Sequence, residues 1–443
     1  MTPQQIADLR RRAETGEARA QYALASALSG AGQRDEADLW LKRAAEAGDP
    51  EAHFTLATRL LQKKTGLSEA RALLEQSVSG GSTAGMRTLS VLLADGFGVP
   101  SDWRSALRLV LRAARSGDAP AARDLGGLLI LKDIDDIDGG ALIESAAMLD
   151  PVAGATFVRR AIEGRGNPGT AQGVLARLVN IKYPRAEQLK RRLSQTAAGV
   201  RDKEFPNAKA TPSLDWTRIE SKLATIEPAL GGLARRAGAL RPSERAVVHE
   251  PISAAPHAYA VRDAVPPEML EYLMAAAARC LGPSMTFDPL TGAPRKDEYR
   301  TSMTATLGPA DQDLSIVAIN QLLARFAGIE HSRGEFISVL RYAPGEEYRP
   351  HFDWIPPTGR DFAACGQRIM TALLYLNDEY EGGETHFMAP DVKFKGAPGD
   401  VLIFSNVTAD GAPDSAARHA GLPVRAGVKW IASKWFRERE FAF

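Results

Sequence analysis

The chain has 443 residues, more than the roughly 250–300 residues that one hydrophobic core supports, so we expect more than one domain. Its 55 lysines and arginines balance 54 aspartates and glutamates, which gives no general electrostatic reason to bind nucleic acid or acidic lipid. No segment approaches the ~20 consecutive apolar residues of a membrane span, and the N-terminus has no apolar secretory core. We therefore expect a soluble, cytoplasmic protein that binds neither nucleic acid nor a membrane.

The first third of the chain is repetitive. Glycines stand at positions 16, 48, 81 and 117, at intervals of 32, 33 and 36 residues. Each is followed four positions later by a small residue and eight positions later by a leucine: Ala20, Ala52, Gly85 and Ala121, then Leu24, Leu56, Leu89 and Leu125. Such a pattern predicts short helix pairs, because glycine ends a helix and small residues let neighbouring helices approach closely. One pair cannot bury its apolar face alone, so the pairs must stack.

Residues 93–126 resemble the Sel-like branch of the tetratricopeptide repeats, and the resemblance extends over about 5–160. We therefore predict an all-α helical-repeat solenoid over 1–160. Repeats of this kind generally bind proteins or peptides on a concave face, whereas the alternative is a scaffold or dimerisation arm without a ligand of its own. Both interpretations stay open. We assign 161–245 to a helical extension and linker, whose basic run at 190–193 is either a solvated helix face or a partner contact.

The pattern changes after about residue 246. Amphipathic helices are predicted over 266–281 and 313–329, followed by short runs of β-forming residues separated by tight-turn signals. The runs are EFISVLRYAPG, RIMTALLYLN, GGETHFMA, GDVLIFSN and VKWIASKWFRE. Many short strands after two helices favour an α+β domain with a β-sandwich or jelly-roll core over 246–443.

A metal-binding pattern lies among these strands. His351 and Asp353 are two residues apart, so on an extended strand they project from the same face. His419 follows 66 residues after Asp353, which leaves enough chain to return to the same pocket. Two histidines and one carboxylate form the facial triad of non-haem Fe(II) oxygenases, although His-x-Asp alone is a weak signal.

Lys429 strengthens this interpretation. In a strand it shares its face with Ile431, Ser433 and Trp435, and a lysine on an apolar face needs an anionic partner, such as the distal carboxylate of an iron-chelating cosubstrate. Lys434 falls on the opposite face, and we expect it to be solvated.

Residues from about 296 to 438 resemble the 2-oxoglutarate- and Fe(II)-dependent prolyl 4-hydroxylases. The matching segments are RTS, EFISVLRYAPGEEYRPHFDW, QRIMTALLYLN, EGGETHF, KGAPGDVLIF and RHAGLPVRAGVKWIASKW. The resemblance implies a double-stranded β-helix, a variant of the jelly roll, so the chain is expected to be multidomain. Segment 286–299 does not align readily, and Arg437 stands where many relatives carry a histidine or another residue.

The resemblance also implies roles for individual residues. The catalytic iron ligands would be His351, Asp353 and His419. Lys429, Tyr342 and Thr385 would bind 2-oxoglutarate. The residues implied to line a peptide-substrate groove are Arg300, Glu335, Tyr348, Arg368 and Trp435. From the residues alone, the two tyrosines could instead be core aromatics, and Arg368 could pair with a carboxylate such as Asp361.

The activity implied by the resemblance is that of an oxidoreductase, a procollagen-proline 4-dioxygenase-like enzyme. It would use Fe(II), O₂ and 2-oxoglutarate, with ascorbate as reductant, to hydroxylate a protein or peptide side chain, most simply proline, with the repeats recruiting the substrate or a partner. The alternatives are a dioxygenase acting on another side chain or a small molecule, and an inert repeat-based scaffold.

Other potential ligands are assigned structural roles. His386 alternates with Thr385 and should face away from the cosubstrate, and His331 is expected to be exposed in a turn. The two cysteines, Cys280 and Cys365, cannot form a disulfide framework or a four-thiolate zinc site, and we expect reduced thiols.

Overall fold

The computed structural model describes residues 3–63, 65–97, 100–133, 136–199, 213–233, 249–287, 294–296, 299–357 and 360–441. The chain packs into two compact units. The first comprises Met1–Ala121 with Gly308–Leu314, and the second comprises Ala122–Leu307 with Ser315–Ala442. None of the described helices is long and apolar enough to cross a membrane.

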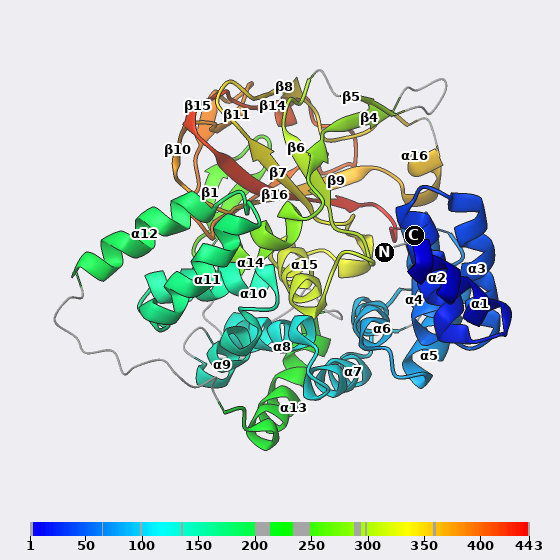
Figure 1. Ribbon diagram of the computed structural model, residues 1–443. Coiled ribbons are helices and arrows are strands. Elements are labelled where there is room, and N and C mark those ends of the chain that lie inside the picture. The colour runs from blue at the N-terminus through cyan, green and yellow to red at the C-terminus, as the bar shows by residue number, and fades with distance from the viewer. Residues whose placement is uncertain are drawn as a thin grey trace. The chain divides into compact units, whose positions relative to one another are not determined.

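The first unit is a series of short helices, coloured blue to cyan in Figure 1. The helices are α1 (Pro3–Glu14), α2 (Ala18–Gly30), α3 (Arg34–Glu46), α4 (Pro50–Gln62), α5 (Leu67–Ser79), α6 (Thr83–Asp95) and α7 (Trp103–Arg115). The four predicted helix-ending glycines have left-handed φ angles of 89°, 86°, 90° and 86°, which L-residues with a Cβ rarely adopt. After Gly48, Asp49 accepts hydrogen bonds from the backbone N–H groups of Glu51 and Ala52 and caps α4, a contribution of about 1 kcal/mol.

Small residues bring the repeat helices together as predicted. Ala20 and Ala52 are fully packed, at 1% and 0% exposure. At the equivalent position in the third repeat, a Cβ added to Gly85 would collide with the Ser77 hydroxyl. The repeat pattern in the sequence therefore corresponds to helix-to-helix contacts in the structure.

Further helices belong to the second unit. They are α8 (Ala119–Lys132, from Ala122 on), α9 (Ile137–Ala146), α10 (Pro151–Ile162), α11 (Pro168–Asn180), α12 (Ala186–Gly199) and α13 (Trp216–Leu233). Phe157 of α10 and Leu189 of α12 share one hydrophobic cluster with Leu273 of α14 (Pro267–Ala278) and Trp430 of the sheet. The compact units therefore divide the chain differently from the predicted ranges 1–160, 161–245 and 246–443, because these helices share a core with the strands. Residues 200–212 and 234–245 of the predicted helical extension and linker lie outside the described residues.

The described strands form a large and a smaller antiparallel sheet. The large sheet runs in the order β1 (His249–Ser253), β2 (Ala258–Val261), β13 (Val401–Ser405), β9 (Arg368–Tyr375), β16 (Lys429–Arg437), β7 (Ser338–Tyr342), β6 (Met303–Thr306) and β3 (Gly282–Pro283). The smaller sheet runs in the order β12 (Val392–Phe394), β11 (Thr385–Phe387), β14 (His419–Gly421) and β8 (Tyr348–His351). Two short ribbons pair β10 (Tyr380–Gly382) with β15 (Val424–Gly427), and β4 (Met285–Phe287) with β5 (Pro294–Lys296). This is the predicted jelly-roll fold.

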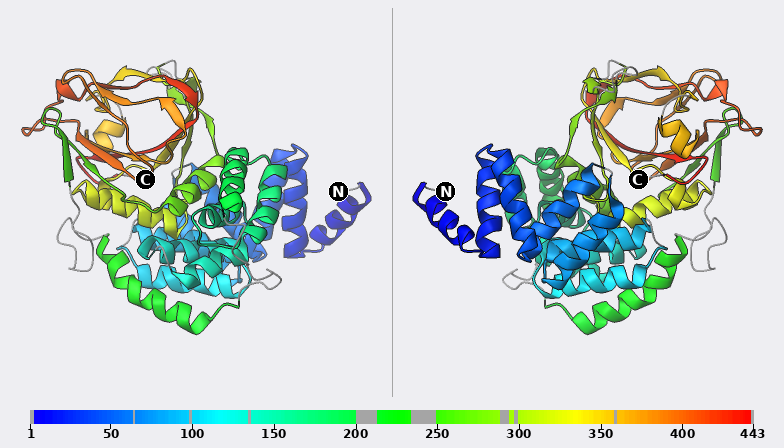
Figure 2. Two further views of the ribbon diagram at one scale, coloured as in Figure 1. Left: turned by 90° about the vertical axis from the view of Figure 1, so that its left-hand side faces the viewer. Right: turned by 90° about the vertical axis from the view of Figure 1, so that its right-hand side faces the viewer.

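The two faces of the large sheet have different partners. Alternate residues of β16, among them Trp430 and Ala432, join the cluster of α14 and α15 (Leu314–Phe326). Ile431 joins the opposite cluster, which includes Phe387 of the smaller sheet. Figure 2 shows the yellow helix α15 along one side of the strands. The other side of the large sheet faces the space between the two sheets. Short helices complete the unit: η1 (His331–Arg333), α16 (Arg360–Cys365) and η2 (Ser415–Ala417).

Candidate active site

Three potential metal ligands meet where two strands of the smaller sheet pair. His351 ends β8, His419 begins β14, and the two residues are directly opposite in the antiparallel register. Asp353 follows two residues after His351, and its carboxylate oxygens lie 3.5 Å from Nε2 of His351 and 3.8 Å from Nε2 of His419. One ligand atom from each of the three lies within 4.8 Å of the others, a spacing that one metal ion can bridge.

Hydrogen bonds to neighbouring groups orient these side chains. Nδ1 of His351 lies 2.8 Å from the carbonyl oxygen of Arg349, and Nδ1 of His419 lies 3.0 Å from that of Ala417. A carbonyl can only accept, so each Nδ1 donates a proton to it and Nε2 is the atom directed at a metal. The hydroxyl of Thr371 donates to Asp353 at 2.7 Å and in turn accepts from Asn406 at 2.9 Å.

The electrostatics suit a divalent cation. Burial disfavours ionisation of Asp353, but the two neighbouring histidines and the bond from Thr371 outweigh it and hold the pKa of Asp353 below its ordinary value. Burial, with a smaller contribution from His351, lowers the pKa of His419 to about 4. At neutral pH the site therefore offers a carboxylate and an uncharged imidazole at His419, the protonation states that metal ligation requires.

A buried lysine lines the same pocket. Lys429 is 3% exposed and stands opposite Tyr342 in the register of β16 with β7. Its ammonium group donates to the carbonyl of Gly383 at 2.7 Å and lies 5.6 Å from the centre of the Tyr342 ring. Among the described residues no carboxylate forms an ion pair with Lys429, and burial lowers its pKa to about 8. A buried ammonium with one neutral acceptor is suited to an anionic ligand.

The pocket brings most of the predicted site together. Its lining consists of Arg300, Leu340, Tyr342, Tyr348, His351, Asp353, Leu373, Thr385, His419, Gly421, Lys429, Ile431, Ser433 and Trp435. The hydroxyl of Thr385 lies 2.8 Å from that of Tyr375. The pocket is therefore lined by a three-ligand metal cluster, by the cation of Lys429 and by the hydroxyl-bearing residues Tyr342 and Thr385, groups that suit an iron-chelating dicarboxylate.

Comparisons with known proteins agree with this geometry. The family model of the 2OG-Fe(II) oxygenase superfamily matches residues 337–437. Prolyl 4-hydroxylase 1 of Arabidopsis thaliana is 35% identical over 204 residues, which is 43% of this chain and 72% of that protein. The chain belongs to the prolyl 4-hydroxylase family. Like the other members of this superfamily it is a dioxygenase that depends on Fe(II) and 2-oxoglutarate, and the chemistry of the donor set fits that metal.

Solved structures similar to this prolyl 4-hydroxylase family member each cover part of the chain. The viral collagen prolyl hydroxylase of Paramecium bursaria Chlorella virus-1, solved with 2-oxoglutarate, is 25% identical with a TM-score of 0.32 and covers 41% of this chain and 95% of its own. A Sel1 repeat protein from Oxalobacter formigenes is 28% identical with a TM-score of 0.24 and covers 26% of this chain and 93% of its own.

The five residues implied to contact the peptide fall into two groups in this family member. Arg300, Tyr348 and Trp435 line the pocket. The Tyr348 ring stacks on the ring of His351 with centroids 3.4 Å apart, and the Arg300 guanidinium lies 5.3 Å from the centre of the Tyr348 ring. The two tyrosines of the predicted site are therefore pocket residues as well as packed aromatics.

Glu335 and Arg368 form the second group, since they pair with each other. Two parallel bonds of 2.7 and 2.8 Å join the guanidinium to the carboxylate, and Arg437 contacts the same carboxylate at 2.6 Å. The Arg368 guanidinium lies 4.2 Å from the centre of the Trp435 ring, so the ion pair of Arg368 and Glu335 packs against Trp435. Of the segment that does not align, 288–293, 297 and 298 lie outside the described residues, as does the side chain of Asp361.

Two expectations about burial are wrong. Lys434 does face away from Lys429, but it is 1% exposed, and its ammonium donates to the side chain of Asn320 and to the carbonyl of Glu335. Helix α15 covers this face of the sheet, which the sequence pattern did not reveal. His331 is 8% exposed because η1 packs into the unit. His386 does turn away from the pocket and contacts Asp391, and neither Cys280 nor Cys365 forms a disulfide bond.

Sequence reasoning missed the residues that hold the ligands. Thr371 and Asn406 support Asp353, and Tyr375 contacts Thr385. Thr371 and Leu373 share one face of β9, and Leu373 lines the pocket. A hydroxyl on the pocket-facing side of an otherwise apolar strand was the signal available in the sequence.

Proposed function

We propose that this enzyme hydroxylates proline residues of a peptide or protein, with Fe(II) held by His351, Asp353 and His419. In this proposal Lys429, Tyr342 and Thr385 hold 2-oxoglutarate. The observation that carries it is the meeting, in one pocket, of a His-Asp-His cluster and a buried lysine that forms no ion pair with a carboxylate of the described residues.

The bound iron, with O₂ and 2-oxoglutarate, supplies the oxidising chemistry that hydroxylates an unreactive C–H bond. The protein contributes orientation and exclusion of water. Carbonyls fix both imidazoles, Thr371 fixes the carboxylate, and Lys429 neutralises the distal charge of the cosubstrate inside a pocket with apolar walls such as Leu340 and Ile431. No acid–base side chain is required for these roles.

The pocket residues also favour a cyclic, apolar side chain as substrate. Tyr348 and Trp435 supply two aromatic groups on the pocket wall, and Arg300 lies beside Tyr348. Proline packs well on aromatic rings, and Arg300 can donate to the carbonyls of an extended peptide. The relatives named prolyl 4-hydroxylases support proline over another side chain or a small molecule.

The test combines cosubstrate turnover with product analysis. Purified protein with Fe(II), ascorbate as reductant, 2-oxoglutarate and proline-rich peptides should form succinate and add the mass of one oxygen atom to proline. His351→Ala is the matched inactive control. Failure of the wild-type protein to bind Fe(II) and 2-oxoglutarate would remove the catalytic assignment. Oxygen found on another residue would keep the enzyme and replace the substrate.

The helical repeats have a separate proposed role, recruitment of the protein substrate by an enzyme that works in the cytoplasm. Stacked repeats create extended surfaces suited to peptides and proteins. Removing residues 1–48, which contain α1 to α3, should leave peptide-independent turnover of 2-oxoglutarate unchanged and reduce hydroxylation of the native target. Equal target hydroxylation by both proteins, measured by mass spectrometry of the host proteome, would contradict recruitment through α1 to α3.

A further inference from the structure

At Lys429, strand β16 has a neighbouring strand on one side only, among the strands that the structure describes. On one side, β7 pairs with β16 up to Lys429 itself. On the other side, the pairing of β9 with β16 stops at Tyr375 and Ile431, two residues short of Lys429. The chain then enters the loop 376–379, which leads to β10.

The side chain of Asn377 continues the pairing where β9 ends. Its amide nitrogen donates to the carbonyl of Val428 at 2.8 Å, and its oxygen accepts from the backbone N–H of Trp430 at 2.7 Å. These are the residues immediately before and after Lys429. Asn377 is 3% exposed, so one buried amide fixes the backbone on both sides of the lysine.

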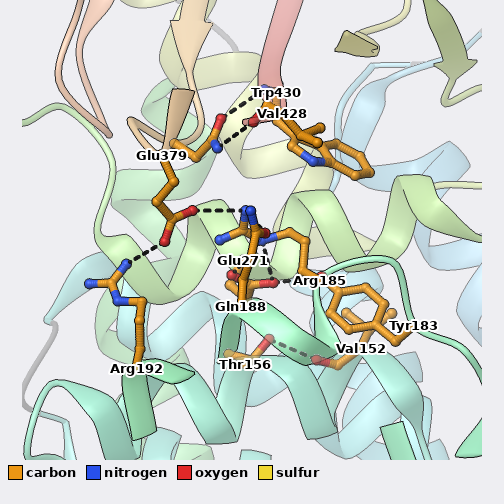
Figure 3. Close-up of polar contacts among 11 residues, drawn as sticks. Val152, Thr156, Tyr183, Arg185, Gln188, Arg192, Glu271, Glu379, Val428 and Trp430 are labelled. Atoms are coloured by element: carbon orange, nitrogen blue, oxygen red, sulfur yellow. Dashed lines mark hydrogen bonds and ion pairs between the residues drawn. The ribbon is translucent and has the colours of Figure 1, made fainter. Parts of the chain in front are cut away.

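Two arginines of the helical region hold the same loop. Arg185, just before α12, and Arg192, within α12, each donate to one carboxylate oxygen of Glu379 at 3.2 Å. Figure 3 shows Glu379 between them. Burial raises the pKa of Glu379, but the charges of Arg185 and Arg192 lower it by more, so the carboxylate is ionised at neutral pH.

Arg185 is itself fixed by the core of the unit. Its guanidinium contacts both oxygens of Glu271 on α14 at 3.1 Å, and Tyr183 donates to Glu271 at 2.6 Å. Arg185 and Glu271 are 2% and 1% exposed in their side chains. The contacts therefore run without a break from α14 and α12 through Glu379 and its loop to the backbone of Lys429.

We infer that Glu379 and Arg192 are positioning residues for 2-oxoglutarate, because they fix the loop whose Asn377 keeps Lys429 aimed at the cosubstrate. The inference rests on the proposed function, since that function assigns Lys429 to the distal carboxylate. It makes α12, which lies outside the segment matched by the oxygenase family model, a functional part of the cosubstrate site.

The test uses the full chain with Fe(II) and two point variants, Glu379→Ala and Arg192→Ala. Kinetics of succinate formation and calorimetric titration with 2-oxoglutarate should show KM and Kd raised about tenfold, with kcat at saturation and Fe(II) affinity within about twofold of wild type. Arg192→Lys keeps the charge and should recover most of the affinity. Glu381→Ala, an exposed carboxylate two residues along the same segment, is the matched control and should behave as wild type.

The outcomes separate the two proposals. Wild-type protein that fails to bind 2-oxoglutarate would refute the proposed function itself. Wild-type binding together with unchanged affinity in Glu379→Ala and Arg192→Ala would overturn this inference alone. An equal loss in Glu381→Ala would also overturn it, because the effect would then not depend on the contact with α12. Arg185 is left intact, since its removal would strand the buried carboxylate of Glu271.

Discussion

The two faces of β16 carry one buried lysine each, and the lysines differ in what they contact. Lys434 faces α15 and donates to two acceptors of the protein. Lys429 faces the pocket, where a backbone carbonyl is the acceptor found for its ammonium group within the described residues. Both are at most 3% exposed, so burial alone does not distinguish a structural lysine from a functional one.

The two lysines differ in how many hydrogen-bond acceptors the protein provides for each ammonium group. A buried ammonium is stable when several groups accept its hydrogen bonds, and Lys434 approaches that condition. Lys429 keeps donors available in a pocket that also holds the iron-ligand cluster. A chain that leaves a buried cation incompletely satisfied loses stability, and binding of an anion restores it.

The largest expected effect concerns the pocket side of the sheet. Asp353→Ala removes the carboxylate ligand, so succinate formation should fall by more than about 100-fold, beyond what loss of a supporting residue costs. The melting temperature of the metal-free protein should change little. The variant loses the contacts of the Asp353 carboxylate, but it no longer has to bury that charge. Substantial turnover by Asp353→Ala would place the metal elsewhere.

The two lysines provide a matched pair. Lys429→Met should raise the KM for 2-oxoglutarate about 10–100-fold, the cost of a charge-assisted hydrogen bond, and leave the free energy of unfolding unchanged or higher. Lys434→Met should lower the free energy of unfolding by about 1–3 kcal/mol without changing that KM, because it leaves buried acceptors unpaired. Enzyme kinetics measure the KM, and urea denaturation measures the free energy of unfolding. Identical values for the two variants would contradict the distinction between the two faces of β16.

A smaller effect is expected at the support of Asp353. Thr371→Val removes the hydroxyl that orients the carboxylate but keeps the shape of the side chain, and Fe(II) affinity should fall about tenfold. Thr371→Ser retains the hydroxyl and serves as the control. Metal titration in the absence of 2-oxoglutarate measures the affinity directly, and equal values for both variants would deny Thr371 this role.

The smallest effect is a dependence on pH. The pKa of Lys429 is lowered to about 8 from an ordinary 10.5, mainly by burial, against the raising effect of Glu384 and with a further lowering by Lys395. Below about pH 8 the ammonium is charged and pairs with the cosubstrate, so the Kd should rise less than about tenfold from pH 8 to pH 9 as it loses its proton. Lys429→Arg should remove this dependence, and a steep rise in that variant would assign the titration to another group.

The lowered pKa of Lys429 also makes the free energy of unfolding depend on pH. The folded protein releases the Lys429 proton at a lower pH than the unfolded chain, so between pH 8 and 10.5 the unfolded state binds more protons. The contribution of Lys429 to the free energy of unfolding should therefore increase with pH across this window. Comparing wild type with Lys429→Met by denaturant unfolding at several pH values isolates it.

Features that depend on local spacing could be predicted from the sequence. Helix pairs follow from glycines and small residues about 33 positions apart, because such residues control where a helix ends and how closely it packs. The strands and the pocket face of Lys429 follow from the alternation of side chains along an extended chain. The sequence also paired His351 with Asp353, although Asp353 lies in a bend after β8 and not on the strand. The resemblance to prolyl 4-hydroxylases then identified the distant His419 and the cosubstrate residues.

Contacts between segments far apart in the sequence could not be predicted in this way. Lys434 has the local pattern of an exposed lysine, and it is buried because α15 covers its side of the sheet. Glu335 and Arg368 are 33 residues apart and pair with each other behind Trp435. Arg192 contacts Glu379, which is 187 residues away in the sequence. No periodic pattern in the sequence indicates this contact between charged groups. Such contacts depend on packing between distant segments, and in this chain they join the helices to the cosubstrate pocket.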